Sequence, residues 1–166
     1  MKKRIISYLL IIALAGMLSS CAKAPSCSEL LISALEVSGE SCERNGLFYF
    51  SEAIEGEAQY LSPQVIKSLY GEDAAARYFS LVEDFAIFVS QRTPGELAIL
   101  KCYSRSDTDE IAGMCLQRAD AIKVGLRKSE YAEKSKSICV RVYKSFVVLY
   151  FVENVQKTEE MISGSI

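Results

Sequence analysis

Apolar residues recur along this chain with two different spacings, which predict helices in some segments and strands in others. Near residue 30 they fall three or four positions apart. Ser26 and Glu29 precede them with the spacing of a capping box, so a helix is predicted to begin there. Similar stripes and end signals predict helices at 63–71, at 107–128 and after Asn154. Runs rich in β-branched and aromatic residues predict strands at 84–89, 96–103, 138–143 and 146–152.

The order of these elements determines the predicted fold class, which is α+β. Each pair of strands is joined by a short segment, Thr93-Pro94-Gly95 in the first pair and Lys144-Ser145 in the second, so two hairpins are expected. Hairpins with helices between them favour a two-layer domain, in which helices pack on a mainly antiparallel sheet of about four strands. The predicted order is α-α-β-β-α-β-β-α.

The first twenty residues have the pattern of an export signal. Lys2, Lys3 and Arg4 form a basic segment, and a mostly apolar stretch follows at 5–18. That stretch is shorter than the roughly 20 residues that a membrane-spanning helix needs. It ends in Leu18-Ser19-Ser20-Cys21, which resembles a bacterial lipobox, with Cys21 as the predicted site of lipidation. The alternative is a plain secretory signal with a cysteine at this position.

Processing before Cys21 divides the chain into four predicted parts. They are a lipoprotein signal peptide at 1–20, the lipidated cysteine and a short tether at 21–25, an N-terminal helix and acidic region at 26–60, and an α+β domain at 61–166. Five residues reach at most about 17 Å. If the first helix belongs to the folded body, the domain is held close to the bilayer. If it does not, residues 36–61 form a longer linker.

The composition excludes several classes of function. The chain has 166 residues and no histidine, so Ser-His-Asp and Cys-His catalytic pairs and histidine-ligated zinc are absent. Removal of the signal peptide takes three of the 19 basic residues and none of the 21 acidic ones, which leaves a net charge of 16 − 21 = −5. Nucleic acid is therefore not an expected partner. No cofactor, metal site or catalytic residue is predicted.

Five cysteines remain after Cys21, an odd number that allows at most two disulfides. Cys27 and Cys42 flank the first predicted helix and are the candidates for a disulfide. Cys102, Cys115 and Cys139 lie within apolar patterns and are expected to be buried thiols.

Basic residues are concentrated in the second half of the chain. One hypothesis is that they contact anionic headgroups or envelope polymers, and the alternative is an ordinary solvated face. Interspersed acidic residues favour the alternative. The residues concerned are Arg127, Lys128, Lys134 and Lys136.

Several segments from residue 61 onward resemble a family of small bacterial lipoproteins, catalogued as domain of unknown function four-three-five-eight and found mostly in Gram-positive anaerobes. The segments are Leu69-Tyr70-Gly71, residues 95–101, the long helix with Arg118, and residues 147–152 followed by Glu153-Asn154. The resemblance implies a location in the cell envelope and no defined activity.

Together these patterns predict an exported lipoprotein, anchored to the outer face of the cell membrane by its lipid. The expected role is that of a non-catalytic interaction or accessory module with an envelope protein as partner. The alternatives are a receptor domain for a small ligand or ion, and an envelope enzyme that works without histidine. The sequence does not predict an oligomeric state.

Overall fold

The computed structural model describes residues 25–40 and 46–166, apart from the side chains of Asp73, Ala75, Ala76 and Phe79. One antiparallel sheet forms its centre, with the strand order β1-β2-β3-β5-β4. This confirms the α+β class with a mainly antiparallel sheet. The strands are β1 (Gly46–Phe50), β2 (Val82–Ser90), β3 (Glu96–Cys102), β4 (Cys139–Tyr143) and β5 (Phe146–Phe151).

The expected number of about four strands is wrong, because the described sheet also contains β1 at its edge. In the register, Phe48 lies opposite Phe88 of β2. The strand is short, and only Tyr49 in it is buried. It also pairs with a strand more than thirty residues further along the chain, so no hairpin signal accompanies it.

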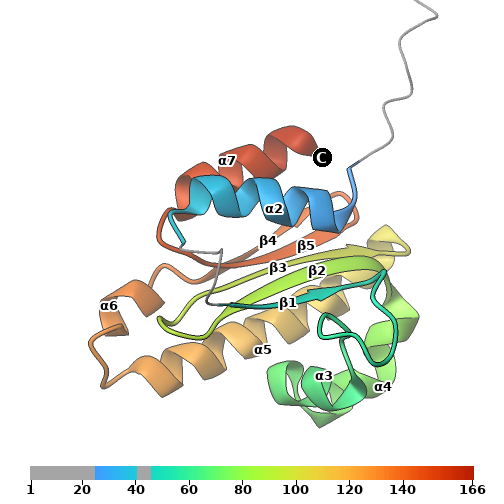
Figure 1. The fold of residues 1–166 in the computed structure, drawn as a ribbon, viewed down its shortest axis with the longest axis horizontal. Helices are drawn as coiled ribbons and strands as arrows, with labels where there is room; N and C mark the ends of the chain where they lie inside the picture. The colour runs from blue at the N-terminus through green and yellow to red at the C-terminus, as the bar shows by residue number, and fades with distance from the viewer. Residues whose placement is uncertain (1–24, 41–45) are drawn as a thin grey trace, which may run out of the picture.

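Helices cover both faces of the sheet, so the predicted two-layer arrangement is also wrong (Figure 1). On one face lie α2 (Cys27–Ser38) and α7 (Val155–Ser165). On the other lie α3 (Pro63–Tyr70), α4 (Glu72–Leu81) and α5 (Thr108–Leu126). The 3-10 turn η1 (Arg105–Asp107) and the short α6 (Ala132–Ser135) precede and follow α5. The predicted element order lacked β1, α4 and α6.

The central strands explain the third layer. All six residues of β5 are buried, and β3 is buried at six of its seven positions. Side chains point alternately to the two faces of a strand, so such strands need cover on both sides. One apolar core therefore lies between the sheet and α3–α5, and a second lies between the sheet and α2 with α7.

Local signals at the helix ends were predicted well. The Ser26–Glu29 capping box is present at the start of α2, Ser62 caps α3 with Pro63 in its first turn, and Asn154 Oδ1 accepts from Lys157 N at the start of α7. No helix in the described ranges is both long and apolar enough to cross a membrane.

One end signal was misassigned. We expected Asp107 to form a capping box with Glu110, but Asp107 Oδ2 instead accepts hydrogen bonds from Ser104 N at 3.1 Å and from Ser104 Oγ at 2.8 Å. The side chain of Asp107 thus closes η1 and makes no cap to α5. The sequence places Ser104 three residues before Asp107 and Glu110 three residues after it, so either pair could form a capping box. Because η1 precedes α5, the pair with Ser104 forms.

Candidate functional site

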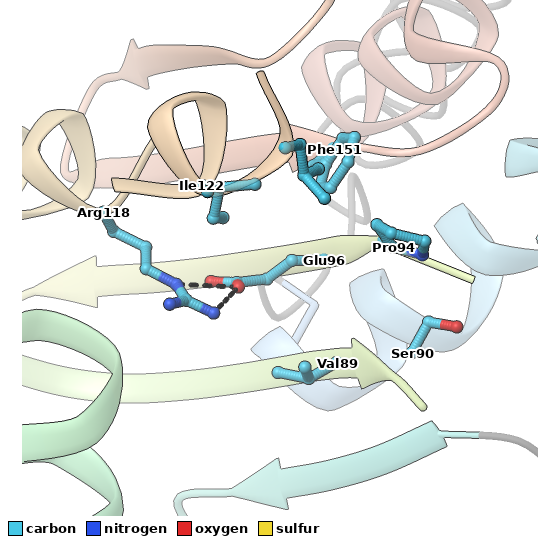
Figure 2. A pocket seen from close by; sticks show the side chains of 10 residues that line it. Val89, Ser90, Pro94, Glu96, Arg118, Ile122 and Phe151 are labelled. Carbon is cyan, nitrogen blue, oxygen red and sulfur yellow. Dashed lines mark hydrogen bonds and ion pairs between the residues drawn. The ribbon is translucent and has the colours of Figure 1, made fainter. Parts of the chain in front are cut away.

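A cavity of ≈ 350 Å³, widely open to solvent, lies where the end of β2, the start of β3 and the end of β5 meet the last turns of α5. Its walls are mainly apolar and include Val89, Ile122, Leu126 and Phe151. In Figure 2 these strands and α5 surround the cavity, and the charged side chains of Glu96 and Arg118 approach each other beside it.

Glu96 and Arg118 form a largely buried ion pair across the interface between β3 and α5. Arg118 Nε and Nη2 both donate to Glu96 Oε2, at 3.0 and 2.7 Å. The side chain of Glu96 is 2% exposed and that of Arg118 is 21% exposed. Glu96 Oε1 is buried and has no hydrogen-bond partner in the described part of the chain. Arg118 is therefore the member of the pair that remains within reach of solvent.

The sheet register and the helix period bring the two charges together. Glu96 is the first residue of β3 and lies opposite Val89 on one side and Phe151 on the other. Arg118 follows Cys115 by three residues and precedes Ile122 by four, so it lies in the apolar stripe of α5. Two signals in the sequence could have pointed to this pair. Arg118 is a charge inside an apolar stripe, and Glu96 is a charge that begins an apolar strand.

Burial dominates the electrostatics of the pair. It raises the pKa of the Glu96 carboxyl, and the attraction and hydrogen bonds of Arg118 oppose the rise without cancelling it. Desolvation of a carboxylate is costly, and a single guanidinium on one of its oxygens compensates only part of that cost. The charged form of Glu96 therefore depends on Arg118 for its stabilisation.

Two neutral groups lie near this pair in the same core. The hydroxyl of Tyr70 is buried without a hydrogen-bond partner in the described residues. Burial raises the pKa of Tyr70 well above its usual value, and the charge of Glu96 adds to the rise. Burial likewise raises the pKa of the Cys115 thiol, again with a contribution from Glu96. A thiol and a phenol held in their neutral forms are poor nucleophiles and bases.

A second charged cluster contacts Phe151, one of the residues that line the cavity. Lys134 Nζ lies 3.0 Å from Glu40 Oε1, 2.6 Å from Glu153 Oε1 and 5.3 Å from the centre of the Phe151 ring. The Lys134 side chain is only 12% exposed. Its charge is therefore balanced by two carboxylates and makes a cation–π contact with Phe151.

This cluster weakens the hypothesis of a basic surface. Lys134 is paired with two glutamates, and Lys136 Nζ lies 2.6 Å from Glu133 Oε1. Arg127 and Lys128 are exposed. Two of these four basic residues are thus paired with carboxylates, and Lys134 is paired with glutamates from outside the basic segment.

The predicted site residues fall partly outside the described ranges. Cys21 and Cys42 both lie there, so lipidation and the Cys27–Cys42 disulfide stay predictions. Cys27 is fully buried, and its Sγ donates to the carbonyl of Asp84 at 3.5 Å. Cys102 and Cys115 are buried as expected, whereas Cys139 is only half-buried. The four cysteines in the described residues form no disulfide with one another.

Among residues 25–40 and 46–166, no group of three or more cysteine, aspartate or glutamate side chains is placed to hold a metal ion. Comparison with protein-family models, with curated proteins and with solved structures finds no match for this chain. The resemblance to the lipoprotein family stays a prediction from the residues alone.

Proposed function

We propose that this chain is an exported, lipid-anchored protein of the cell envelope, and that it acts as a non-catalytic accessory module by binding a small ligand in the cavity beside Glu96 and Arg118. The observation that carries the proposal is the cavity itself. Its volume is ≈ 350 Å³, its walls are mainly apolar, and a buried ion pair lies at its side. Small-molecule sites commonly combine this size with apolar walls and a few fixed polar groups.

The position of the cavity fits a protein anchored by Cys21. At the start of α2, the backbone N–H of Cys27 donates to Asp84 Oδ2 at 2.8 Å, and Asp84 lies near the start of β2. The cavity lies at the opposite end of β2, beyond Val89, about 16 Å away along the strand. Figure 1 has the start of α2 and the turn between β2 and β3 at opposite ends of the sheet. A tether of at most about 17 Å would hold the start of α2 near the bilayer, with the cavity at the other end of the sheet.

The chemistry of the site favours binding over catalysis. Arg118 is held by Glu96, and the neighbouring phenol and thiol are kept neutral by burial. None of these groups is an activated nucleophile or a general base near neutral pH. The cavity is therefore better suited to hold a molecule than to transform one.

Filling the cavity at Gly125 is expected to abolish ligand binding. Gly125 lines the cavity, and a Cβ placed there would meet no atom within 4 Å beyond the nearby backbone of its own helix. Gly125→Phe should therefore place a ring in the cavity without strain and weaken the binding of small aromatic fragments at least about tenfold. The measurement is a titration of the full-length protein in nanodiscs, followed through the methyl resonances of Ile122.

Gly113→Phe is the matched control. Gly113 is also in α5, a Cβ there has the same free space, and it does not line this cavity. We expect fragment binding to this variant to equal that of the wild type. Equal binding to all three proteins, or the absence of any fragment that perturbs Ile122, would contradict the proposed function.

Cys21→Ser is expected to release the protein from membranes. Two acyl chains at about 0.8 kcal/mol per CH₂ hold a protein to a bilayer almost permanently, and serine cannot accept the thioether-linked lipid. The measurement is fractionation of cells with metabolic labelling by a radioactive fatty acid, and Cys27→Ser is the control that keeps the lipobox. If the Cys21→Ser protein keeps its label and its membrane association, the anchor is not at this residue.

A further inference from the structure

We infer that the ligand of this cavity is a neutral molecule with an apolar body and one carbonyl-type acceptor that receives a hydrogen bond from Arg118. The inference rests on the proposed function of the cavity and adds the chemical class of its ligand. It follows from which atoms of the ion pair are already used, from the charge balance of the site and from the character of its walls.

Arg118 has donors left over. Its Nε and Nη2 both bind Glu96 Oε2, and Nη1 has no hydrogen-bond partner in the described part of the chain. A guanidinium has five N–H groups, so Nη1 contributes two that are free. The side chain lines the cavity and is 21% exposed, whereas Glu96 is almost completely covered. The charged group that a ligand can reach is therefore a hydrogen-bond donor. The hydroxyl of Ser90, which also lines the cavity, can donate as well, so an acceptor on the ligand satisfies either group.

Glu96 acts as a positioning residue for this donor. It also lines the cavity, but its side chain is 2% exposed, so it offers a ligand much less surface than Arg118 does. Its two hydrogen bonds fix the plane of the guanidinium before any ligand arrives, which lowers the entropic cost of binding. Figure 2 shows Arg118 extending from α5 toward Glu96 of β3, with both hydrogen bonds ending on the carboxylate.

The charge balance favours a neutral acceptor over an anion. The Glu96 carboxylate already neutralises Arg118 at 2.7 Å. A ligand carboxylate would add a negative charge close to Glu96 in a mainly apolar environment, where an uncompensated charge is costly. A ketone, ester or amide oxygen accepts the same hydrogen bond without that cost.

The walls of the cavity determine the size and the apolar character of the rest of the ligand. Val89, Ile122, Leu126 and Phe151 present apolar surface to the cavity. The volume of ≈ 350 Å³ accommodates one or two rings or a short branched chain. Burial of that surface supplies most of the affinity, and Arg118 supplies orientation and selectivity.

Three probes of similar size test the inference: acetophenone, which is a neutral acceptor, ethylbenzene, which has no acceptor, and benzoate, which is an anion. Their dissociation constants are measured on the full-length protein in nanodiscs through the Ile122 methyl resonances. The double variant Glu96→Met/Arg118→Met is measured under the same conditions, because the comparison cancels the partition of each probe into lipid. It replaces both charges by apolar side chains of similar length and is expected to fold.

The quantity compared is the ratio of the dissociation constant of ethylbenzene to that of acetophenone. We expect this ratio to be about tenfold larger for the wild-type protein than for the double variant. Glu96→Gln tests the role of Glu96 through the preference between probes, which would not change if the ion pair only stabilised the fold. This variant leaves Arg118 without its counterion, so the preference should change from acetophenone to benzoate.

The remaining outcomes overturn the inference. If the wild type binds acetophenone and ethylbenzene with the same ratio as the double variant, Arg118 does not recognise an acceptor. If the wild type prefers benzoate, the ligand class is anionic. In both cases the proposed function survives, provided that Gly125→Phe abolishes the binding. If none of the three probes perturbs Ile122 saturably, the inference fails. The proposed function is then judged separately, on the wider fragment set tested with Gly125→Phe and Gly113→Phe.

Discussion

Replacement of Arg118 by alanine is expected to lower the free energy of unfolding by about 3–5 kcal/mol, because it leaves the Glu96 carboxyl buried without a counterion. Glu96 is 2% exposed and its Oε1 already lacks a partner among the described residues, so no side chain there is placed to take over the lost hydrogen bonds. The variant protein must either keep an unpaired buried charge or protonate it. The measurement is urea unfolding of the full-length protein at neutral pH, followed by circular dichroism.

A surface pair provides the control for this experiment. Arg77 Nη1 lies 2.9 Å from Glu110 Oε1, but the Arg77 side chain is 68% exposed. Exposed pairs are weak, so Arg77→Ala should change the free energy of unfolding by less than about 1 kcal/mol. The double variant Glu96→Met/Arg118→Met removes both buried charges and should be close to the wild type in stability. If Arg118→Ala lowers the free energy of unfolding no more than Arg77→Ala does, the Glu96–Arg118 pair does not act as a buried ion pair.

The elements that could be predicted from the sequence are those with local causes. Capping residues such as Ser26, Ser62 and Asn154 act within three positions of the residue that donates to them, so their spacing is visible in the chain. The hairpin between β4 and β5 was also found. Lys144 adopts a positive φ of 53° there, a conformation that glycine or asparagine usually provides.

The layers could not be predicted as readily, because they depend on partners far apart in the chain. The continuous apolar run of β5 indicates burial on both faces, yet the helices that provide the cover begin at Cys27 and at Val155 on one face and at Pro63 and Thr108 on the other. The edge strand β1 is defined by its pairing with β2, which pattern alone does not reveal.

The candidate site was missed for the same reason. Glu96 and Arg118 are 22 positions apart and belong to different elements, so neither predicts the other. What the sequence does contain is a charge at an apolar position in each element. A test for charges that interrupt an apolar stripe would have selected Arg118, and a search for a partner of opposite sign at the start of an apolar strand would have selected Glu96.

The contribution of α2 to the folded body decides how the domain can be held at a membrane. Leu31 is fully buried in the core between α2, α7 and the sheet, together with residues such as Phe88 and Ile99. Leu31→Ala should therefore lower the free energy of unfolding by about 2–5 kcal/mol, through lost apolar burial and the cavity that remains. Unfolding of the full-length protein in urea measures this directly.

Ile32 is the matched control, because it is the next residue of the same helix and its side chain is 55% exposed. Ile32→Ala should change the free energy of unfolding by no more than about 0.5 kcal/mol. A large difference between the two variants makes α2 an integral part of the domain, and leaves only residues 21–25 as the proposed tether. Small effects of both would make α2 a linker. The reach from Cys21 would then grow from about 17 Å to several times that distance, and the domain would no longer be held close to the bilayer.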